Sequence, residues 1–304
     1  GQERFFPIRT IDIAPTLANI VGVEAPTTVE GRCMDLGLFG AGACPVVAPA
    51  ASAVEEVAAG WGLDLLELPR EASVGLVTGA TVANFVCLAA ARSEVLRHLG
   101  LGSQRVKTIA CDALGQILPE AFAAAIAEID GPAIAVLQAG QINTGGCDPF
   151  GQIIPMAQAK GIWVHVDGAF GLWAQAAPAR RHLTAGVELA DSWATDGHKW
   201  LQTPYDCGFA IVRDAEAHRR AMAISASYLP PAEGSDRDPS AYVPELSRRA
   251  RGFATWAMIK ALGRDGIAEM VECNCAVAAH MAARLAEVPG IASVVPVTLN
   301  QFMV

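Results

Sequence analysis

Apolar positions recur with two different spacings along this chain of 304 residues. Segments with a helical period of about 3.6 residues alternate with short, unbroken apolar runs, which are typical of buried strands. The pattern predicts helices at 51–67, 81–97, 118–129, 151–160, 214–223, 248–262 and 265–287, and strands at 105–111, 132–138, 162–167, 191–195 and 207–213. Helices that alternate with buried strands predict an α/β fold in which helices cover both faces of a mainly parallel sheet.

Composition limits the class of protein. The chain is 52% hydrophobic and 17% charged, so it can bury a large core in one large or two smaller domains. Its net charge of −9, with only short arginine clusters, argues against a general nucleic-acid surface. The longest uncharged apolar stretch, 36–54, is broken by Gly and Pro, so we expect no membrane span. The eight cysteines are scattered without CxxC spacing. We therefore expect no metal site, and reduced core cysteines in a cytoplasmic protein.

Open α/β sheets bind ligands at the carboxyl ends of their strands, and two short segments of this sequence carry residues suited to such a site. Asp167 ends the apolar run 162–167, and the small Gly168 and Ala169 follow it. A strand-end Asp is also common as a turn cap. Ala80 and Thr81 open the helix that follows Gly79, where free N–H groups can hold a phosphate, although many ordinary helices begin in the same way.

The stretch "SWATDGHKWLQTPYDCG", residues 192–208, places His198 and Lys199 at the end of another predicted strand. Taken alone, Lys199 can be a lysine that lays its stem over apolar surface and keeps its ammonium in water. Together with the helix start and Asp167, the order of the three motifs suits pyridoxal phosphate chemistry. That chemistry needs a lysine amine for the aldehyde, a phosphate anchor and a carboxylate facing the pyridine nitrogen.

Residues 45–304 resemble the group II pyridoxal-phosphate-dependent amino acid decarboxylases, which include aromatic-L-amino-acid and glutamate decarboxylases. The similarity is carried by "GLVTGATVANFVCLAAAR", "QAGQINTGGCDPF", "WVHVDGAFGLWAQ" and "DSWATDGHKWLQTPYDCGFAIVRD". The resemblance implies an aspartate-aminotransferase-like (type I) fold, a homodimer with active sites at its interface, and an amino acid substrate. It also implies that the large domain covers 45–245 and that 246–304 begin a small C-terminal domain, with the final run before Val304 as one of its strands.

The same resemblance implies roles for individual residues. Lys199 is expected to be the Schiff-base lysine, His198 a neighbour that holds the phosphate, and Asp167 the partner of the pyridinium. Ala169 is expected to pack under the ring, with Ala80 and Thr81 in the phosphate loop. Asn143 or Thr144 occupies a position where the family contacts the cofactor.

The chain departs from the family in one interval. Between Phe85 and Asp167 the family has a few dozen more residues, including a histidine that stacks on the pyridine ring. Here the interval holds only His98 and His165, and His165 is expected to point into the packing of its strand. We interpret this as a deletion near 95–98; the alternative is a shorter loop with His98 in the stacking position.

The first segment has a different resemblance. Residues 7–40, within a segment 1–44, resemble the C-terminal end of alkaline-phosphatase-superfamily proteins, but no histidine precedes His98, so phosphatase chemistry is not expected. A foreign first segment, an internal gap and an early end together predict a fragment or a fused reading frame.

The sequence thus predicts decarboxylation of an L-amino acid, with two alternatives left open. One is an aminotransferase or another lyase on the same fold, and the other is a non-catalytic remnant.

Overall fold

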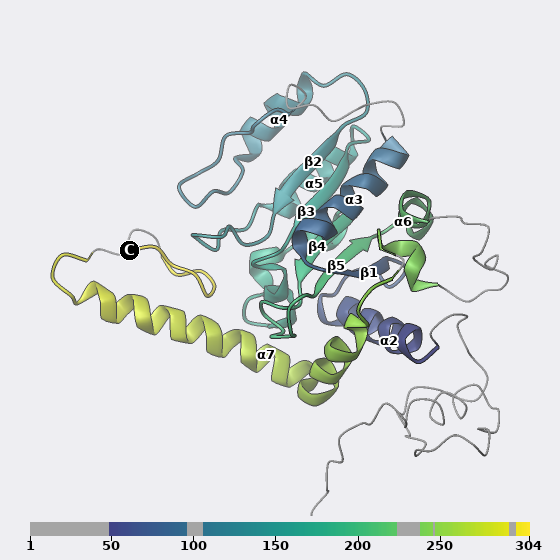
Figure 1. Ribbon diagram of the computed structural model, residues 1–304. Coiled ribbons are helices and arrows are strands. Elements are labelled where there is room, and N and C mark those ends of the chain that lie inside the picture. The colour runs from purple at the N-terminus through teal and green to yellow at the C-terminus, as the bar shows by residue number, and fades with distance from the viewer. Residues whose placement is uncertain (1–48, 96–105, 224–237, 246, 292–295) are drawn as a thin grey trace, which may run out of the picture.

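The central feature of the protein is a five-stranded sheet in the order β1-β5-β4-β3-β2, seen in a computed structural model (Figure 1). The structure describes residues 49–95, 106–223, 238–245, 247–291 and 296–304. The strands are β1 (Ser73–Val77), β2 (Ile134–Gln138), β3 (Trp163–Asp167), β4 (Ser192–Asp196) and β5 (Gly208–Val212). The predicted segment 1–44 and His98 lie outside the described residues.

The sheet is mixed but mainly parallel, as predicted, because four of its five described strands, β1 to β4, run in the same direction and only β5 runs against them. β2 pairs with β3 and β3 with β4 in parallel, whereas β4 pairs with β5 and β5 with β1 in antiparallel register. The reason lies in the connection between β4 and β5, residues 197–207, which contains no helix. Parallel neighbours need a crossover of a dozen or more residues, usually helical, and this connection is too short to provide one.

Helices cover both faces of the sheet, as predicted (Figure 1). The helices are α2 (Pro49–Leu65), α3 (Ala80–Val95), α4 (Pro119–Ala127), α5 (Phe150–Gln158), α6 (Ala215–Met222) and α7 (Arg251–Ala286). Short 3₁₀ helices are η3 (Leu172–Ala176), η4 (Arg181–Thr184), η5 (Val187–Leu189) and η6 (Pro239–Tyr242). Helices α3 and α6 pack on one face of the sheet, while α2, α5 and α7 contribute to the core on the other.

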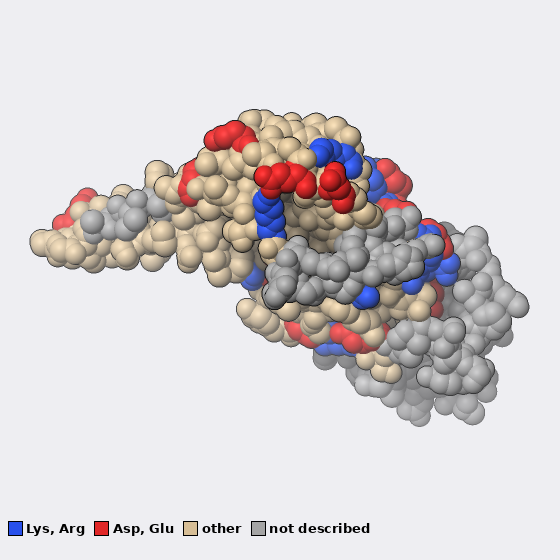
Figure 2. All heavy atoms as spheres, turned by 90° about the horizontal axis from the view of Figure 1, so that it is seen from above, with Lys and Arg blue, Asp and Glu red and all other residues tan. Residues whose placement is uncertain are grey.

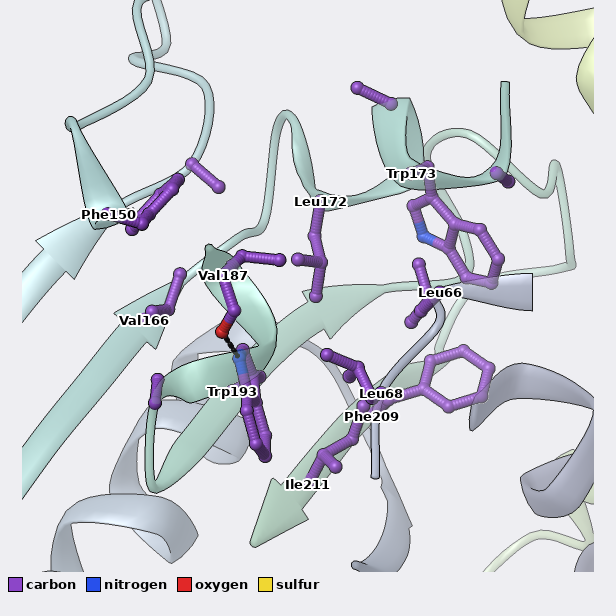
Figure 3. Close-up of a cluster of buried hydrophobic side chains, with 14 of the residues drawn as sticks. Leu66, Leu68, Phe150, Val166, Leu172, Trp173, Val187, Trp193, Phe209 and Ile211 are labelled. Carbon is purple, nitrogen blue, oxygen red and sulfur yellow. Dashed lines mark hydrogen bonds between the residues drawn. The ribbon is translucent and has the colours of Figure 1, made fainter. Parts of the chain in front are cut away.

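The two cores differ in the size of their side chains. Successive strand residues point to opposite faces, so Trp193 and Ala194 of β4 belong to different cores. The core beneath α2, α5 and α7 contains large rings, and the indole N–H of Trp193 donates to the Val187 carbonyl at 2.8 Å (Figure 3). On the other face, small residues such as Ala194 and Ala210 let α3 lie close to the sheet. This close packing fixes the beginning of α3 relative to the strand ends.

Several element predictions need correction. The run 105–111 is not a strand among its described residues, because only Cys111 makes an isolated bridge, to Ile117. β1 is a strand that the pattern did not predict. The predicted helices 248–262 and 265–287 form α7, with a break at Gly263, where φ is 62°. The final run before Val304 contains no strand over 296–304.

Membrane and surface features are simple in the part of the chain that the structure describes. No described helix is both long and apolar enough to cross a bilayer. The described His, Cys, Asp and Glu residues form no cluster of three or more that could hold a metal ion. On the face shown in Figure 2, Lys and Arg lie interspersed with Asp and Glu among uncharged residues. This mixed surface does not resemble the continuous basic area that phosphate backbones require.

Candidate active site

The predicted site residues gather at one edge of the sheet, where β3 and β4 end. Asp167 is the last residue of β3, and Asp196 is the last residue of β4. Because the two strands are parallel neighbours, their carboxyl ends meet at the same edge. Helix α3 begins at Ala80 beside this edge and packs against both strands. The edge therefore places two carboxylates next to the N-terminus of a helix.

Asp196 connects the helix start to the lysine. Its Oδ1 accepts a hydrogen bond from the Ala80 backbone N–H at 2.6 Å, which satisfies one of the free donors of the first turn of α3. Its Oδ2 lies 2.7 Å from Lys199 Nζ, and its Oδ1 lies 3.6 Å from His198 Nε2. The Asp196 side chain is only 4% exposed. One buried carboxylate thus joins the predicted phosphate loop to the predicted Schiff-base lysine.

Lys199 lies in an apolar stretch because the residues after it enter the core. Trp200 and Leu201 are buried, and the Trp200 indole donates to the Phe170 carbonyl at 2.9 Å. The Lys199 ammonium lies 3.4 Å from the centre of the Phe170 ring, which is a favourable cation–π position, in addition to its ion pair with Asp196. Lys199 is therefore held in one place and is not a lysine whose ammonium extends freely into water.

His198 is fixed by its own set of contacts. Its Nδ1 accepts the backbone N–H of Cys207 at 3.2 Å, so in the neutral ring the proton is on Nε2. The ring stacks on Tyr205 with centroids 4.1 Å apart. On its other side a Cβ added at Gly79 would come within 3.1 Å of His198 Cε1. The Nε2–H group consequently faces the region of Asp196 and the start of α3.

Two glycines allow the helix start and β5 to come together. A Cβ added at Gly208 would lie 2.5 Å from the Gly79 Cα, closer than real side chains come to backbone atoms. Gly208 is the first residue of β5, and Gly79 immediately precedes α3. Any larger residue at 208 would push the helix start away from the strand ends. The position of the Ala80 N–H therefore depends on Gly208.

Asp167 is held from two sides. Its Oδ2 accepts from Asn84 Nδ2 at 2.8 Å, and its Oδ1 accepts from the backbone N–H of Ala169 at 3.1 Å. Asn84 lies one turn beyond the start of α3. His165, two residues earlier on β3, is fully buried, as the sequence predicted. Burial is the main cause that lowers the pKa of His165 from 6.5 to about 4.

The other residues predicted to contact the cofactor are Thr81, Asn143 and Thr144. Thr81 is exposed in the first turn of α3, and Asn143 is exposed in the connection after β2. Thr144 is buried, and its hydroxyl donates to the Leu114 carbonyl at 2.6 Å. The structure thus gathers Ala80, Asp167, Ala169, His198 and Lys199 at the strand ends. The Thr144 hydroxyl is engaged in the packing of its own loop.

Sequence reasoning missed three contributors to this edge: Asp196, Asn84 and Phe170. A signal was present for Asp196, because it ends its strand in the same way that Asp167 ends the neighbouring one. Asn84 lies four residues after Ala80, which places both on the same side of a helix. No pattern in the sequence indicates that the Phe170 ring lies beside the lysine.

Comparison with known proteins gives a consistent assignment. A family model described as "Pyridoxal-dependent decarboxylase conserved domain" matches residues 99–295, which is more than half of the chain. L-2,4-diaminobutyrate decarboxylase of Rhizobium meliloti is 30% identical over 265 residues, covering 77% of this chain and 53% of that protein. L-tyrosine/L-DOPA decarboxylase 2 of Lophophora williamsii is 26% identical, with the same two coverages. The chain spans about half the length of these curated relatives.

Solved structures agree on the fold. The crystal structure of Oryza sativa TDC with PLP and tryptamine has a TM-score of 0.76 at 24% identity, covering 83% of this chain and 61% of that one. Mouse CSAD has a TM-score of 0.72 at 23% identity, covering 83% and 60%. These likenesses concern the fold, which is the type I fold of the decarboxylase structures. None of these comparisons points to an alkaline-phosphatase part. By the family match, the chain belongs to the pyridoxal-dependent decarboxylases.

Proposed function

We propose that the described residues form the cofactor-binding part of a pyridoxal-phosphate-dependent decarboxylase that acts on an L-amino acid. The observation that carries the proposal is the meeting of Lys199, Asp167 and the start of α3 at the ends of two parallel strands. Lys199 Nζ is 2.7 Å from Asp196, and Asp196 in turn accepts the N–H of Ala80. These contacts connect the amine to the helix start through one carboxylate.

The donor set fits pyridoxal phosphate in kind. The N-terminus of α3 and the Nε2–H of His198 suit a phosphate, because both present N–H donors near the positive end of a helix dipole. Gly79 supports this fit, since a side chain there would press on His198 and Asp196. Asp167 is an anion that suits a protonated pyridine nitrogen. When bound, the cofactor supplies an aldehyde for the amines and a ring that accepts electrons from the substrate's α-carbon.

Within this proposal, the protein's own residues have distinct tasks. Lys199 Nζ is an ammonium in its ion pair and must lose a proton before it can act as a nucleophile. The Oδ2 atom of Asp196, at 2.7 Å, is the nearest group placed to receive that proton. Asp167 would face the ring nitrogen of the bound cofactor, where its negative charge would favour the protonated ring. Ala169 leaves a small surface beside Asp167 on which a flat ring can lie.

We extend the proposal to the whole protein with the family as a guide. The amino acid substrates named for its relatives, tyrosine, DOPA and 2,4-diaminobutyrate, define the first set to test. We propose a homodimer whose partner completes the site, and the domain boundaries 45–245 and 246–304. A cytoplasmic location is supported by the free, buried cysteines Cys87, Cys147, Cys207 and Cys275.

The proposed deletion near 95–98 limits the expected activity. β2 is the edge strand of the described sheet, and its Val136 is 53% exposed, which is unusual for a strand of an α/β sheet. An element lost with the proposed deletion, on the face of β2 that carries Val136, would account for that exposure. Without a ring above the pocket, we expect cofactor binding to weaken and decarboxylation to fall much further, because orientation of the scissile bond needs a rigid, dry site.

The test is to supply pyridoxal phosphate and compare products. We expect CO₂ release from at least one of tyrosine, DOPA, 2,4-diaminobutyrate or glutamate, without formation of a keto acid. Keto-acid formation would instead favour an aminotransferase. A protein that binds no pyridoxal phosphate would favour the non-catalytic remnant. Replacement of Lys199 by Ala provides the control, because it removes the amine and should abolish any turnover.

A further inference from the structure

A chain of side-chain hydrogen bonds runs behind Asp167, away from the pocket. Trp163, His165 and Asp167 alternate along β3, so their side chains share the face of the sheet that lies beneath α3. Ser192 lies opposite His165 on β4, and Asn84 reaches down from α3. The joined atoms are Trp163 Nε1 and Ser192 Oγ at 2.9 Å, Ser192 Oγ and His165 Nδ1 at 2.9 Å, His165 Nε2 and Asn84 Oδ1 at 2.9 Å, and Asn84 Nδ2 and Asp167 Oδ2 at 2.8 Å.

The direction of every bond in this chain is fixed by chemistry. An ionised carboxylate only accepts, so the Asn84 amide nitrogen donates to Asp167 and the Asn84 oxygen must accept. His165 therefore carries its proton on Nε2. Because burial keeps His165 neutral, its Nδ1 accepts the Ser192 hydroxyl proton. Ser192 Oγ accepts the Trp163 indole N–H, which can only donate. All donors point toward Asp167.

The end of this hydrogen-bonded series that lies furthest from Asp167 is shielded from water. His165 and Ser192 are fully buried, and Trp163 is 8% exposed. In such surroundings, hydrogen bonds are stronger than in water and polarise one another. The side chains behind Asp167 are also neutral, whereas an Arg or Lys in their place would form an ion pair with Asp167. The arrangement orients the carboxylate without cancelling its charge.

We propose that Asn84 is a positioning residue that fixes the orientation of the Asp167 carboxylate toward the pyridine nitrogen of the cofactor. This inference rests on the proposed function, because it assigns Asp167 that partner. Asn84 itself does not touch the reacting atoms. Its amide donates to one carboxylate oxygen, while the Ala169 N–H occupies the other, so the plane of the carboxyl group is set by two donors from different elements.

The test compares the wild type with Asn84→Leu, which has the same number and branching of side-chain heavy atoms but no hydrogen-bonding group. Both proteins are loaded with pyridoxal phosphate labelled with ¹⁵N in the ring, and the ¹⁵N shift is followed with pH. We expect the ring nitrogen of Asn84→Leu to lose its proton about one pH unit lower, a tenfold change in the protonation equilibrium. Thr195→Val is the matched control, because it removes a buried hydroxyl that donates to the Gly168 carbonyl at 3.0 Å and takes no part in the chain.

The outcomes separate this inference from the proposed function. If the wild type takes up no pyridoxal phosphate, the proposed function fails, and the inference fails with it. If the wild type binds and Asn84→Leu titrates within about 0.2 pH units of it, the proposed function stands and the inference is overturned. A shift of the same size in Thr195→Val would also overturn it, because any lost buried hydrogen bond would then suffice. If Asn84→Leu does not fold, Asn84→Ala is read by the same criteria.

Discussion

The ion pair between Asp196 and Lys199 should be measurable as a coupling free energy in the cofactor-free protein. The perturbations are Asp196→Asn, which keeps an acceptor oxygen for the Ala80 N–H, and Lys199→Met, which keeps most of the stem. The two single variants and the double variant form a thermodynamic cycle that isolates the pair. Both residues lie in one short segment, so each substitution can remove their contact without a rearrangement of distant parts of the protein.

The magnitude follows from the geometry. A hydrogen bond to a charged group contributes about 1.5–3 kcal/mol when it is well buried. Asp196 is 4% exposed, but the Lys199 side chain is 28% exposed, so solvent weakens the attraction. We therefore expect a coupling of about 1–2 kcal/mol, together with a small loss at α3, whose first turn favours a negative charge.

The assay is urea unfolding of the four proteins without cofactor and at low salt. Asp191→Asn provides a matched control from the opposite end of β4. The Asp191 carboxylate also accepts a backbone N–H, from Val164 at 2.7 Å, but burial raises its pKa. Removing that charge relieves a desolvation cost, so Asp191→Asn should lower the free energy of unfolding less than Asp196→Asn does.

A coupling below about 0.3 kcal/mol would mean that the two charges do not interact in solution, contrary to the ion pair seen in the structure. A second expectation sharpens the test. If the cofactor engages the Lys199 nitrogen, as we propose, the Asp196→Asn change should cost less in protein saturated with pyridoxal phosphate than in the cofactor-free protein. An unchanged cost would show that Lys199 stays paired with Asp196.

The remaining predictions concern three other positions. Asp167→Asn should leave labelling of the lysine by cofactor and borohydride intact while decarboxylation, measured as CO₂, falls about a hundredfold or more, which corresponds to roughly 3 kcal/mol; equal rates would contradict the role of Asp167. His165 has a folded pKa of about 4, below its unfolded value, so the unfolded chain takes up the proton first as pH falls. The wild type should therefore lose roughly 3 kcal/mol of unfolding free energy between pH 6.5 and 4 that His165→Gln does not lose, and parallel urea-unfolding curves would disprove this. Gly208→Ala should lower the midpoint of thermal unfolding and weaken pyridoxal phosphate binding, because its Cβ would press on Gly79; unchanged binding would argue against the close approach.

Much of the fold could be predicted because strand and helix periods are local properties of the sequence. The runs at 132–138, 162–167 and 207–213 each contain an observed strand, and the run at 191–195 covers all but the last residue of β4. The direction of β5 could not be read in the same way, because it depends on whether the connection after β4 holds a crossover helix. β1 was missed for a related reason. It is a short strand followed almost directly by α3, and the two were interpreted as one motif.

The residues of the candidate site also fall into those that local sequence patterns predict and those that depend on long-range contacts. Asp167, His198 and Lys199 could be predicted as site residues because each lies at or just after the end of an apolar run, at the edge where ligands bind. Asp196 and Asn84 act through contacts between segments about a hundred residues apart in sequence, since Ala80 meets Asp196 and Asn84 meets Asp167. The sequence pattern placed Asp196 at a strand end and Asn84 on the same side of the helix as Ala80, but it did not show which residues these two would contact. Only the packing of α3 on the strand ends reveals them.

We propose that Lys199 is the amine that takes the cofactor, and the position of the labelled lysine can be mapped by chemical modification. The protein is incubated with pyridoxal phosphate, reduced with borohydride, digested, and the modified peptide is identified by mass spectrometry. Lys107 pairs with Glu128, and Lys160 donates to the Ile126 carbonyl at 2.6 Å, so both are engaged away from the strand ends. We expect modification at Lys199 and its loss in Lys199→Ala. Modification of Lys107, Lys160 or Lys260 in its place, or no modified peptide at all, would contradict it.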